Sequence, residues 1–355
     1  MKFSLFTIAI FCWFGINPTY SIETTDNSVG HGAEKMEINK SSTKLAQSIE
    51  NNPQTAEDYF ARGVSYFNSK QIEKALADFS KAIEINPQYA VAYSNRAIIY
   101  NAFGQLEKSL ADLDRAIELD PQLASAYFNR AILFNQSGQL EKALTDYSKA
   151  IELDPQFVET YYNRGVVYEK LGETEKAIAD YDRTIEVDPQ NANAYVRRGN
   201  LQQDKILRSG DVRDSLEEVD TILASYERAI EIDPQNAGAY LNRSNVYIGL
   251  LGETEKALPD LSKVIELDPQ NIQAYANRGQ IYDQLGETEK ALVDFDRAIE
   301  IDSQYALAYL NRGAIYSRLG NVAQSRQDLE KAAKLFEQQG NSYLYQRAEE
   351  LLEEL

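Results

Sequence analysis

Apolar residues recur along most of the chain three and four positions apart, the spacing that places them on one face of an α-helix. In residues 158–191 two such amphipathic stretches follow each other, with Gly172 between them and the pair Asp188 and Pro189 at the end. The same arrangement recurs every 34 residues, and the prolines that mark it are Pro53, Pro87, Pro121, Pro155 and Pro189. A fixed period of this length predicts an array of helical hairpins, each packed only against its neighbours.

We expect eight repeats. Their boundaries are 56–89, 90–123, 124–157, 158–191, 192–236, 237–271, 272–305 and 306–339. The fifth repeat carries 11 extra residues, and its charged stretch 207–220 lacks the glycine and the ligand spacing of a calcium loop. We therefore expect a longer helix or a solvated loop there rather than a metal site. The sixth repeat has one extra residue near 249–252, and Pro259, early in its second helix, is expected to bend that helix.

Aromatic, small and proline residues keep fixed places within a repeat. In the fourth repeat they are Tyr161, Gly165, Tyr168, Ala177, Tyr181 and Pro189. The small residues let the two helices of a hairpin approach closely, and the aromatic rings fill the gaps. These residues match the signature of the tetratricopeptide repeat family, which the chain resembles over residues 56–339. The resemblance implies an all-α, right-handed superhelical solenoid whose first helices line a concave groove.

Both ends of the chain depart from the repeat. Residues 1–21 have an early lysine, an apolar run and small residues at the cleavage positions, which is the layout of a secretory signal peptide. The apolar run 3–16 is shorter than the roughly 20 residues of a spanning helix, so we favour a cleaved signal over an uncleaved anchor. We expect a disordered linker at 22–42, a partial helix that caps the first repeat at 43–55, and an amphipathic capping helix at 340–355.

Composition narrows the compartment and the class of function. A formal net charge of −19 argues against binding to nucleic acid or to an anionic membrane surface. The single cysteine, Cys12, lies in the predicted signal peptide, and the single histidine, His31, lies in the predicted linker. We therefore predict no catalytic residues, metal, cofactor or small-molecule substrate, and no membrane contact except through a partner or an uncleaved anchor. Export without cysteine fits a bacterial periplasm or a secreted protein, and a thylakoid-type lumen also fits.

An asparagine stands two residues after the tyrosine that opens the first helix of most repeats. This column consists of Asn95, Asn129, Asn163, Asn242, Asn277 and Asn311, and Ala61 and Arg197 interrupt it. The resemblance places the column in the concave groove, where an amide can both donate to and accept from the backbone of a bound peptide. A simple family preference for asparagine at this position is the alternative.

The neighbours of this column differ between the two halves of the array. Apolar groove residues are expected in the N-terminal half at Phe60, Phe128, Tyr162, Val64, Ile98, Ile132 and Val166. Polar ones are expected in the C-terminal half at Asn200, Asn245, Gln280 and Asp283. An extended segment with apolar side chains is therefore the ligand expected in the N-terminal half. The lysines with which the family's chaperone-tail binders clamp a terminal carboxylate are absent, so we do not expect that ligand.

Each asparagine position is followed by an arginine, where the family usually has leucine. The arginines are Arg62, Arg96, Arg130, Arg164, Arg198, Arg243, Arg278 and Arg312. Aspartates recur on the second helices at Asp78, Asp112, Asp146, Asp180, Asp260, Asp294 and Asp328, and Ser225 takes this place in the fifth repeat. The matched positions predict a repeated bidentate ion pair with a structural role.

Together these features predict a non-catalytic scaffold that binds an extended peptide or protein segment in the groove. A permanent structural subunit or assembly factor of an envelope- or membrane-associated complex is the alternative. A permanent subunit often aggregates without its partner, so a stable monomer would favour the scaffold.

Overall fold

The computed structural model describes residues 53–209 and 216–355. The predicted signal peptide and linker, most of the predicted partial cap and the centre of the insertion lie outside the described residues. The described chain divides into two compact parts, here called the N-terminal half (53–194) and the C-terminal half (195–209 and 216–355). No helix among these residues combines the length and the apolarity needed to cross a membrane.

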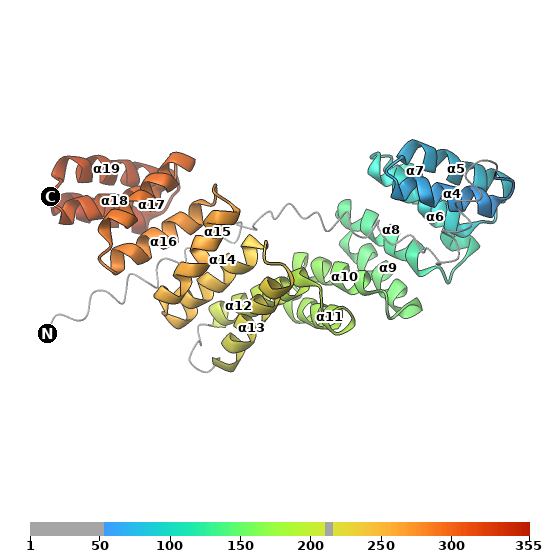
Figure 1. Ribbon diagram of the computed structural model, residues 1–355, viewed down its shortest axis with the longest axis horizontal. Helices are drawn as coiled ribbons and strands as arrows, with labels where there is room; N and C mark the ends of the chain where they lie inside the picture. The colour runs from blue at the N-terminus through green and yellow to red at the C-terminus, as the bar shows by residue number, and fades with distance from the viewer. Residues whose placement is uncertain (1–52, 210–215) are drawn as a thin grey trace. The chain divides into compact units, whose positions relative to one another are not determined.

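Every regular element in the described residues is a helix, and consecutive helices pair as hairpins (Figure 1). The first four hairpins are α4 (Ala56–Asn68) with α5 (Ile72–Ile85), α6 (Ala90–Ala102) with α7 (Leu106–Leu119), α8 (Ala124–Gln136) with α9 (Leu140–Leu153), and α10 (Val158–Lys170) with α11 (Thr174–Val187). The next four are α12 (Ala192–Ser209) with α13 (Leu216–Ile232), α14 (Ala237–Val246) with α15 (Leu258–Leu267), α16 (Ile272–Gln284) with α17 (Thr288–Ile301), and α18 (Ala306–Arg318) with α19 (Val322–Gln338). The prediction of an all-α helical-repeat solenoid is confirmed.

Two glycines of the fourth repeat explain the hairpin geometry. A Cβ on Gly165 would lie 2.9 Å from the Tyr181 ring, so only a residue without a side chain lets α10 and α11 approach this closely. Gly172 has φ +73° between the two helices, a left-handed conformation that costs glycine little. The first repeat lacks this glycine, and Lys70 takes the left-handed conformation there with φ 59°.

The first helices of successive repeats contact one another. These contacts join α6 to α8, α8 to α10, and α16 to α18. Within each half, a second helix packs in turn against the first helix of the next repeat, as α7 does against α8 and α15 against α16. The first helices therefore form one face within each half, which we call the first-helix face.

The irregular fifth and sixth repeats fit one another. The insertion lengthens both helices of its hairpin, since α12 has 18 residues and α13 has 17, against 13 and 14 in α10 and α11. Ile206 and Val219 in this hairpin are buried in one cluster with Leu250 of the sixth repeat. Leu250 lies in a π-helical turn, Tyr247–Leu251, which accommodates the one extra residue. The expected longer helix is thus present on both sides of 210–215.

The expectation that Pro259 bends a helix is wrong. A short 3-10 turn, Thr254–Ala257, precedes α15, and Pro259 lies in the first turn of α15. A proline at this position has no helical partner to lose, because the first amides of a helix lack intrahelical acceptors. The irregularity of the repeat is therefore taken up before α15 begins.

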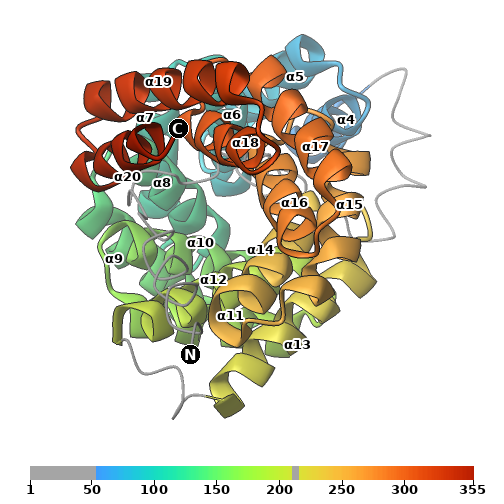
Figure 2. The ribbon, with the colours of Figure 1, turned by 90° about the vertical axis from the view of Figure 1, so that its left-hand side faces the viewer.

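The capping helix α20 (Ser342–Glu353) lies beside α19 (Figure 2). Ala348 is fully buried against Phe336 of α19, and Leu351 and Leu352 pack on the same cluster. The predicted C-terminal cap is confirmed. Tyr343, in the first turn of α20, is 49% exposed.

Candidate functional site

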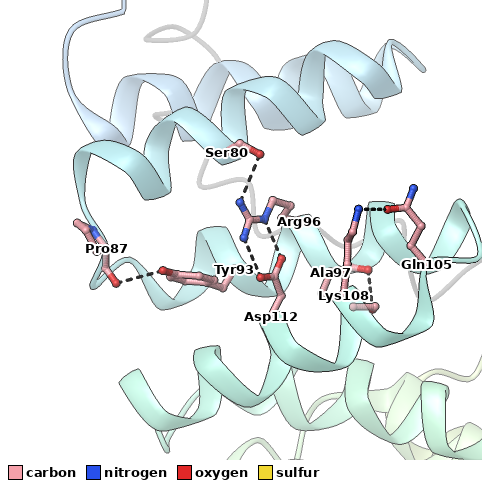
Figure 3. Close-up of polar contacts among 9 residues, drawn as sticks. Ser80, Pro87, Tyr93, Arg96, Ala97, Gln105, Lys108 and Asp112 are labelled. Atoms are coloured by element: carbon pink, nitrogen blue, oxygen red, sulfur yellow. Dashed lines mark hydrogen bonds and ion pairs between the residues drawn. The ribbon is translucent and has the colours of Figure 1, made fainter.

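Five arginines of the column join their repeat to the one before it, and the second repeat shows how (Figure 3). Arg96 donates from Nε and Nη2 to the two carboxylate oxygens of Asp112, at 2.8 Å each. Its third nitrogen, Nη1, donates to Ser80 Oγ of the preceding repeat at 3.4 Å. The rings of Tyr93 and Tyr100 lie 5.6 Å from the guanidinium carbon. The arginine is thus held by its own hairpin and bonded to the neighbouring one.

The predicted bidentate pair is confirmed in the other repeats that have the aspartate. The pairs are Arg62 with Asp78, Arg130 with Asp146, Arg164 with Asp180, Arg243 with Asp260, Arg278 with Asp294, and Arg312 with Asp328. The bonds from Nη1 to the preceding repeat go to three neutral and two ionic acceptors, namely Ser80, Ser148 and Ser262, and Asp114 and Asp296. The hydrogen bond to Asp146 is the main cause that raises the pKa of Arg130, and Asp114 adds to it. In the fifth repeat, Arg198 Nη2 donates to Ser225 Oγ at 2.9 Å.

Two of the three aromatic residues that we expected on the groove surface are buried in the core. Phe128 is 1% exposed and Tyr162 is 7% exposed. The Phe128 ring packs 4.6 Å from Phe157 between centroids, and the Tyr162 ring packs 5.7 Å from Tyr181. Both side chains lie on the side of the first helix that faces the second helix of the same hairpin, and this packing covers their rings.

Phe60 follows the same pattern in the first repeat. It is half-buried between Phe79 and Tyr89, at 5.6 Å and 5.2 Å between ring centroids. The apolar residues that remain half-buried on the first-helix face of the N-terminal half are Ile98, Ile132 and Val166.

The asparagines of the N-terminal half bond in two ways. Asn95 Nδ2 donates to the carbonyl of Val91 at 3.0 Å, and Asn163 Nδ2 donates to that of Glu159 at 2.8 Å. Both acceptors lie four residues earlier in the same helix. Asn129 Nδ2 donates instead to Ser94 Oγ at 3.3 Å. Asn95 is only 8% exposed.

The asparagines of the C-terminal half bond across the joints between repeats. Asn242 Nδ2 donates to Asn200 Oδ1 at 2.7 Å, and Asn277 Nδ2 donates to Asn245 Oδ1 at 3.3 Å. Asn277 is 1% exposed. Asn311, like Asn242, is half-buried.

A tyrosine that the sequence reasoning missed belongs to this network. The hydroxyl of Tyr226 donates toward Asn200 Oδ1 at 2.8 Å and lies 3.0 Å from Gln203 Oε1. Tyr181, at the same place in the fourth repeat, bonds Glu169 at 2.5 Å. The equivalent hydroxyl of Tyr147 is buried and has no partner in the described part of the chain, and burial raises its pKa. The shared repeat position of these tyrosines was the signal that could have found them.

The chemistry that this face offers is hydrogen bonding and apolar contact. Among residues 53–209 and 216–355 there is no group of histidine, cysteine and carboxylate side chains that could hold a metal ion. The amides and hydroxyls along the first helices can donate to and accept from a polypeptide, whose backbone needs both.

Protein-family models described as "TPR repeat" and "Tetratricopeptide repeat" match the chain. The matched segments are 56–89, 79–111, 99–137, 133–172, 158–191, 225–258, 250–286, 272–305 and 306–339. Together they run without a gap from residue 56 to 191 and from residue 225 to 339, which is well over half of the 355 residues. A search of curated proteins found no match.

Solved structures share the fold. Pseudomonas aeruginosa PilF is similar with a TM-score of 0.54 at 16% identity, over 64% of this chain and 97% of that one. A monomeric mutant of IFIT1 with Gppp-AAAA has a TM-score of 0.52 at 16% identity, over 88% of this chain and 75% of that one. YrrB, described as a TPR protein with an unusual peptide-binding site, has a TM-score of 0.46 at 28% identity, over 55% of this chain and 95% of that one.

Proposed function

Because the chain belongs to the tetratricopeptide repeat family, we propose that it binds an extended peptide or protein segment along its first-helix face and performs no chemistry on it. Arrays of stacked repeats are interaction scaffolds, since stacking creates long surfaces that a partner can follow. The chain is a protein-interaction scaffold in this general sense. The finer proposal concerns the surface that is used.

The observation that carries the proposal is the series of first helices in direct contact, with half-buried amides along it. Asn129, Asn242 and Asn311 each have an amide that no secondary structure requires. A polypeptide segment lying there can exchange hydrogen bonds with these amides in place of water. The acidic chain favours a neutral or basic partner.

A triple variant tests the surface. Asn129→Ala, Asn242→Ala and Asn311→Ala together remove half-buried amides, and they leave the more deeply buried Asn95 and Asn277 in place. A matched control carries Lys81→Ala, Lys149→Ala and Lys263→Ala, which lie on the second helices and pair with glutamates three residues on. We expect partners captured from an envelope extract to be lost with the first variant and retained with the control, at equal helicity. Retention with both variants would exclude the first-helix face.

A permanent structural subunit remains the second candidate, because first helices in contact, such as α6, α8 and α10, also offer a surface for a fixed partner. Size-exclusion chromatography with light scattering separates the two. A stable, soluble monomer that exchanges partners supports the scaffold, whereas aggregation relieved only by a co-expressed partner supports the permanent subunit.

We also propose that the protein works outside the cytoplasm, in a bacterial periplasm or in the medium. The layout of residues 1–21 supports this proposal. Amino-terminal sequencing of the protein from fractionated cells is the test. A mature chain that begins near residue 22 is expected, and an intact Met1 in the cytoplasmic fraction would contradict export.

A further inference from the structure

The end of α10 carries a lysine that is held by a neutral group. Lys170 is exposed, and its Nζ donates to Oδ1 of Asn135 in the preceding repeat at 2.7 Å. In the eighth repeat the same place is taken by Arg318, which pairs with the carboxylate of Asp283 in the repeat before it. The two joints therefore differ in their acceptor, which is an amide in the N-terminal half and a carboxylate in the C-terminal half.

No carboxylate pairs with Lys170 in the part of the chain that the structure describes. The helix across the joint, α8, contains no acidic residue, and Glu169 beside the lysine accepts from the hydroxyl of Tyr181. An ammonium group has three donors, of which Asn135 takes one. The other cations on these first helices each bind an aspartate of their own hairpin, and they are Arg62, Arg96, Arg130 and Arg164. Lys170 is thus the cation of this part of the first-helix face that can still take up a carboxylate.

A row of aliphatic side chains ends beside this lysine. Val166 lies four residues before Lys170 in α10, and Ile132 lies three residues before Asn135 in α8, so each pair shares one side of its helix. Ile132 and Val166 are half-buried, as is Ile98 at the same repeat position in α6. The helices α6, α8 and α10 are in contact in this order, so the row crosses three repeats. Apolar contacts beside the ammonium group exclude water and strengthen an ion pair formed there.

We propose that this part of the first-helix face binds an extended segment with aliphatic side chains along the row and one aspartate or glutamate side chain that pairs with Lys170. This inference rests on the proposed function, because it names the ligand chemistry of one part of that face. The net charge of −19 still disfavours a segment that is acidic throughout, so the carboxylate is a single one.

The spacing of the ligand follows from the helices. Packed helices lie about 8–10 Å apart and an extended chain advances about 3.3 Å per residue, so one repeat spans about three ligand residues. One helical turn, about 5.4 Å, separates Val166 from Lys170. The matching segment therefore has an aliphatic residue at every third position and an acidic residue about two positions beyond the last one.

Fluorescence anisotropy with short synthetic peptides tests the inference on the full-length protein. The peptides carry three leucines at every third position in an alanine–serine background, and both their ends are blocked so that the only carboxylate is a side chain. Glutamate or glutamine follows the last leucine by two positions in one pair of peptides and precedes the first leucine by two positions in a second pair. We expect glutamate to bind about threefold more tightly than glutamine in one of the two orders, as an exposed ion pair allows. The preference should disappear at about 1 M salt.

Variants of the lysine assign this preference to one residue. Lys170→Met keeps the aliphatic stem, and it should bind the glutamate and glutamine peptides equally. Lys170→Glu should reverse the order, so that a peptide with lysine at the test position binds most tightly. The matched control is Arg318→Met, which removes the cation at the same repeat position where a carboxylate already pairs with it. All variants must first show equal helicity.

A glutamate preference that survives Lys170→Met, or that Arg318→Met removes to the same extent, overturns the inference. Equal binding of glutamate and glutamine peptides in both orders also overturns it, while binding that needs the leucines leaves the proposed function standing. Peptides that fail to bind at all overturn the inference too, and the capture experiment with the triple asparagine variant then decides the proposed function separately.

Discussion

The two halves of the array use the same asparagine column differently. In the N-terminal half, Asn95 and Asn163 bond their own helices and Asn129 bonds Ser94 Oγ of the preceding repeat, whereas in the C-terminal half Asn242 and Asn277 bond asparagines of the preceding repeat. The position of these partner asparagines, Asn200 and Asn245, is held by isoleucine or valine in the N-terminal half. A column of identical residues therefore does not define one role, because the partner across the joint decides it.

The largest effect is expected where a hairpin loses its buried carboxylate. Asp146→Ala leaves Arg130 without the partner of its two nitrogens, and losing one member of a largely buried pair costs about 3 kcal/mol. Ser225→Ala at the equivalent place in the C-terminal half removes one hydrogen bond to Arg198, at a cost of about 1 kcal/mol. Hydrogen exchange of α8–α9 and α12–α13 measures both. Similar losses in the two hairpins would show that the carboxylate adds nothing to a neutral acceptor.

An intermediate effect is expected at an amide joint. Asn245→Val leaves Asn277 Nδ2 buried without its acceptor, and such a group costs about 2 kcal/mol. Asn163→Val removes a bond to a helix carbonyl in the N-terminal half and should cost about 0.5 kcal/mol. Urea unfolding followed by circular dichroism compares them. If Asn163→Val is as destabilising as Asn245→Val, the two halves do not differ in what the asparagine contributes to stability.

A smaller effect that should be alike in both halves concerns the ionic joints. Asp114 in the N-terminal half and Asp296 in the C-terminal half each accept from Nη1 of the next arginine, and both side chains are 50% exposed. Replacing either aspartate by serine gives the arginine a hydroxyl acceptor like Ser80, and the free energy of unfolding should fall by about 1 kcal/mol or less. High salt should remove most of this cost. Markedly different costs at the two sites would extend the contrast between the halves beyond the amides.

The smallest effect is a pH dependence at one end. Backbone amides of Gln54 and Thr55 donate to Asp58 and lower the pKa of this carboxyl below its ordinary value of 3.8. The folded state then binds the proton less readily than the unfolded one, so the stabilisation is present above pH 3.8 and is lost as the pH falls through the folded pKa. Amide hydrogen exchange at the start of α4 should become faster as the pH falls below 3.8, and Asp58→Asn should remove this pH dependence. The start of α20 is the internal control, because its cap is the side-chain oxygen of Asn341, which accepts from the Leu344 amide and does not titrate.

The sequence predicted the hairpins because their pattern is local and repeated. The spacing of Gly165, Ala177 and Tyr181 requires two helices in close contact, and the structure contains them. The bidentate pairs followed from the matched positions of arginine and aspartate. The lengthened helices α12 and α13 were one of the two forms expected for the insertion.

The surface was predicted less well, because a repeat position gives the side of a helix and not what covers it. Phe128 and Tyr162 lie on the first helices as expected, but rings from neighbouring elements enclose them. The amide pairs depend on side chains 32 and 42 positions apart, and no local pattern shows whether they meet. The fit between the fifth and sixth repeats was missed for the same reason.

The bonds from Arg96, Arg130, Arg164, Arg278 and Arg312 to the preceding repeat give these joints a direction along the chain. A chain leaves the ribosome amino terminus first, so at the joints of Arg96, Arg130 and Arg164 the acceptor is synthesised before the arginine that needs it. Deleting repeats from the carboxyl end leaves every remaining arginine with its acceptors, whereas deleting them from the amino end strips Nη1 of the new first repeat. Such a protein can gain or lose repeats at one end with less disturbance than at the other.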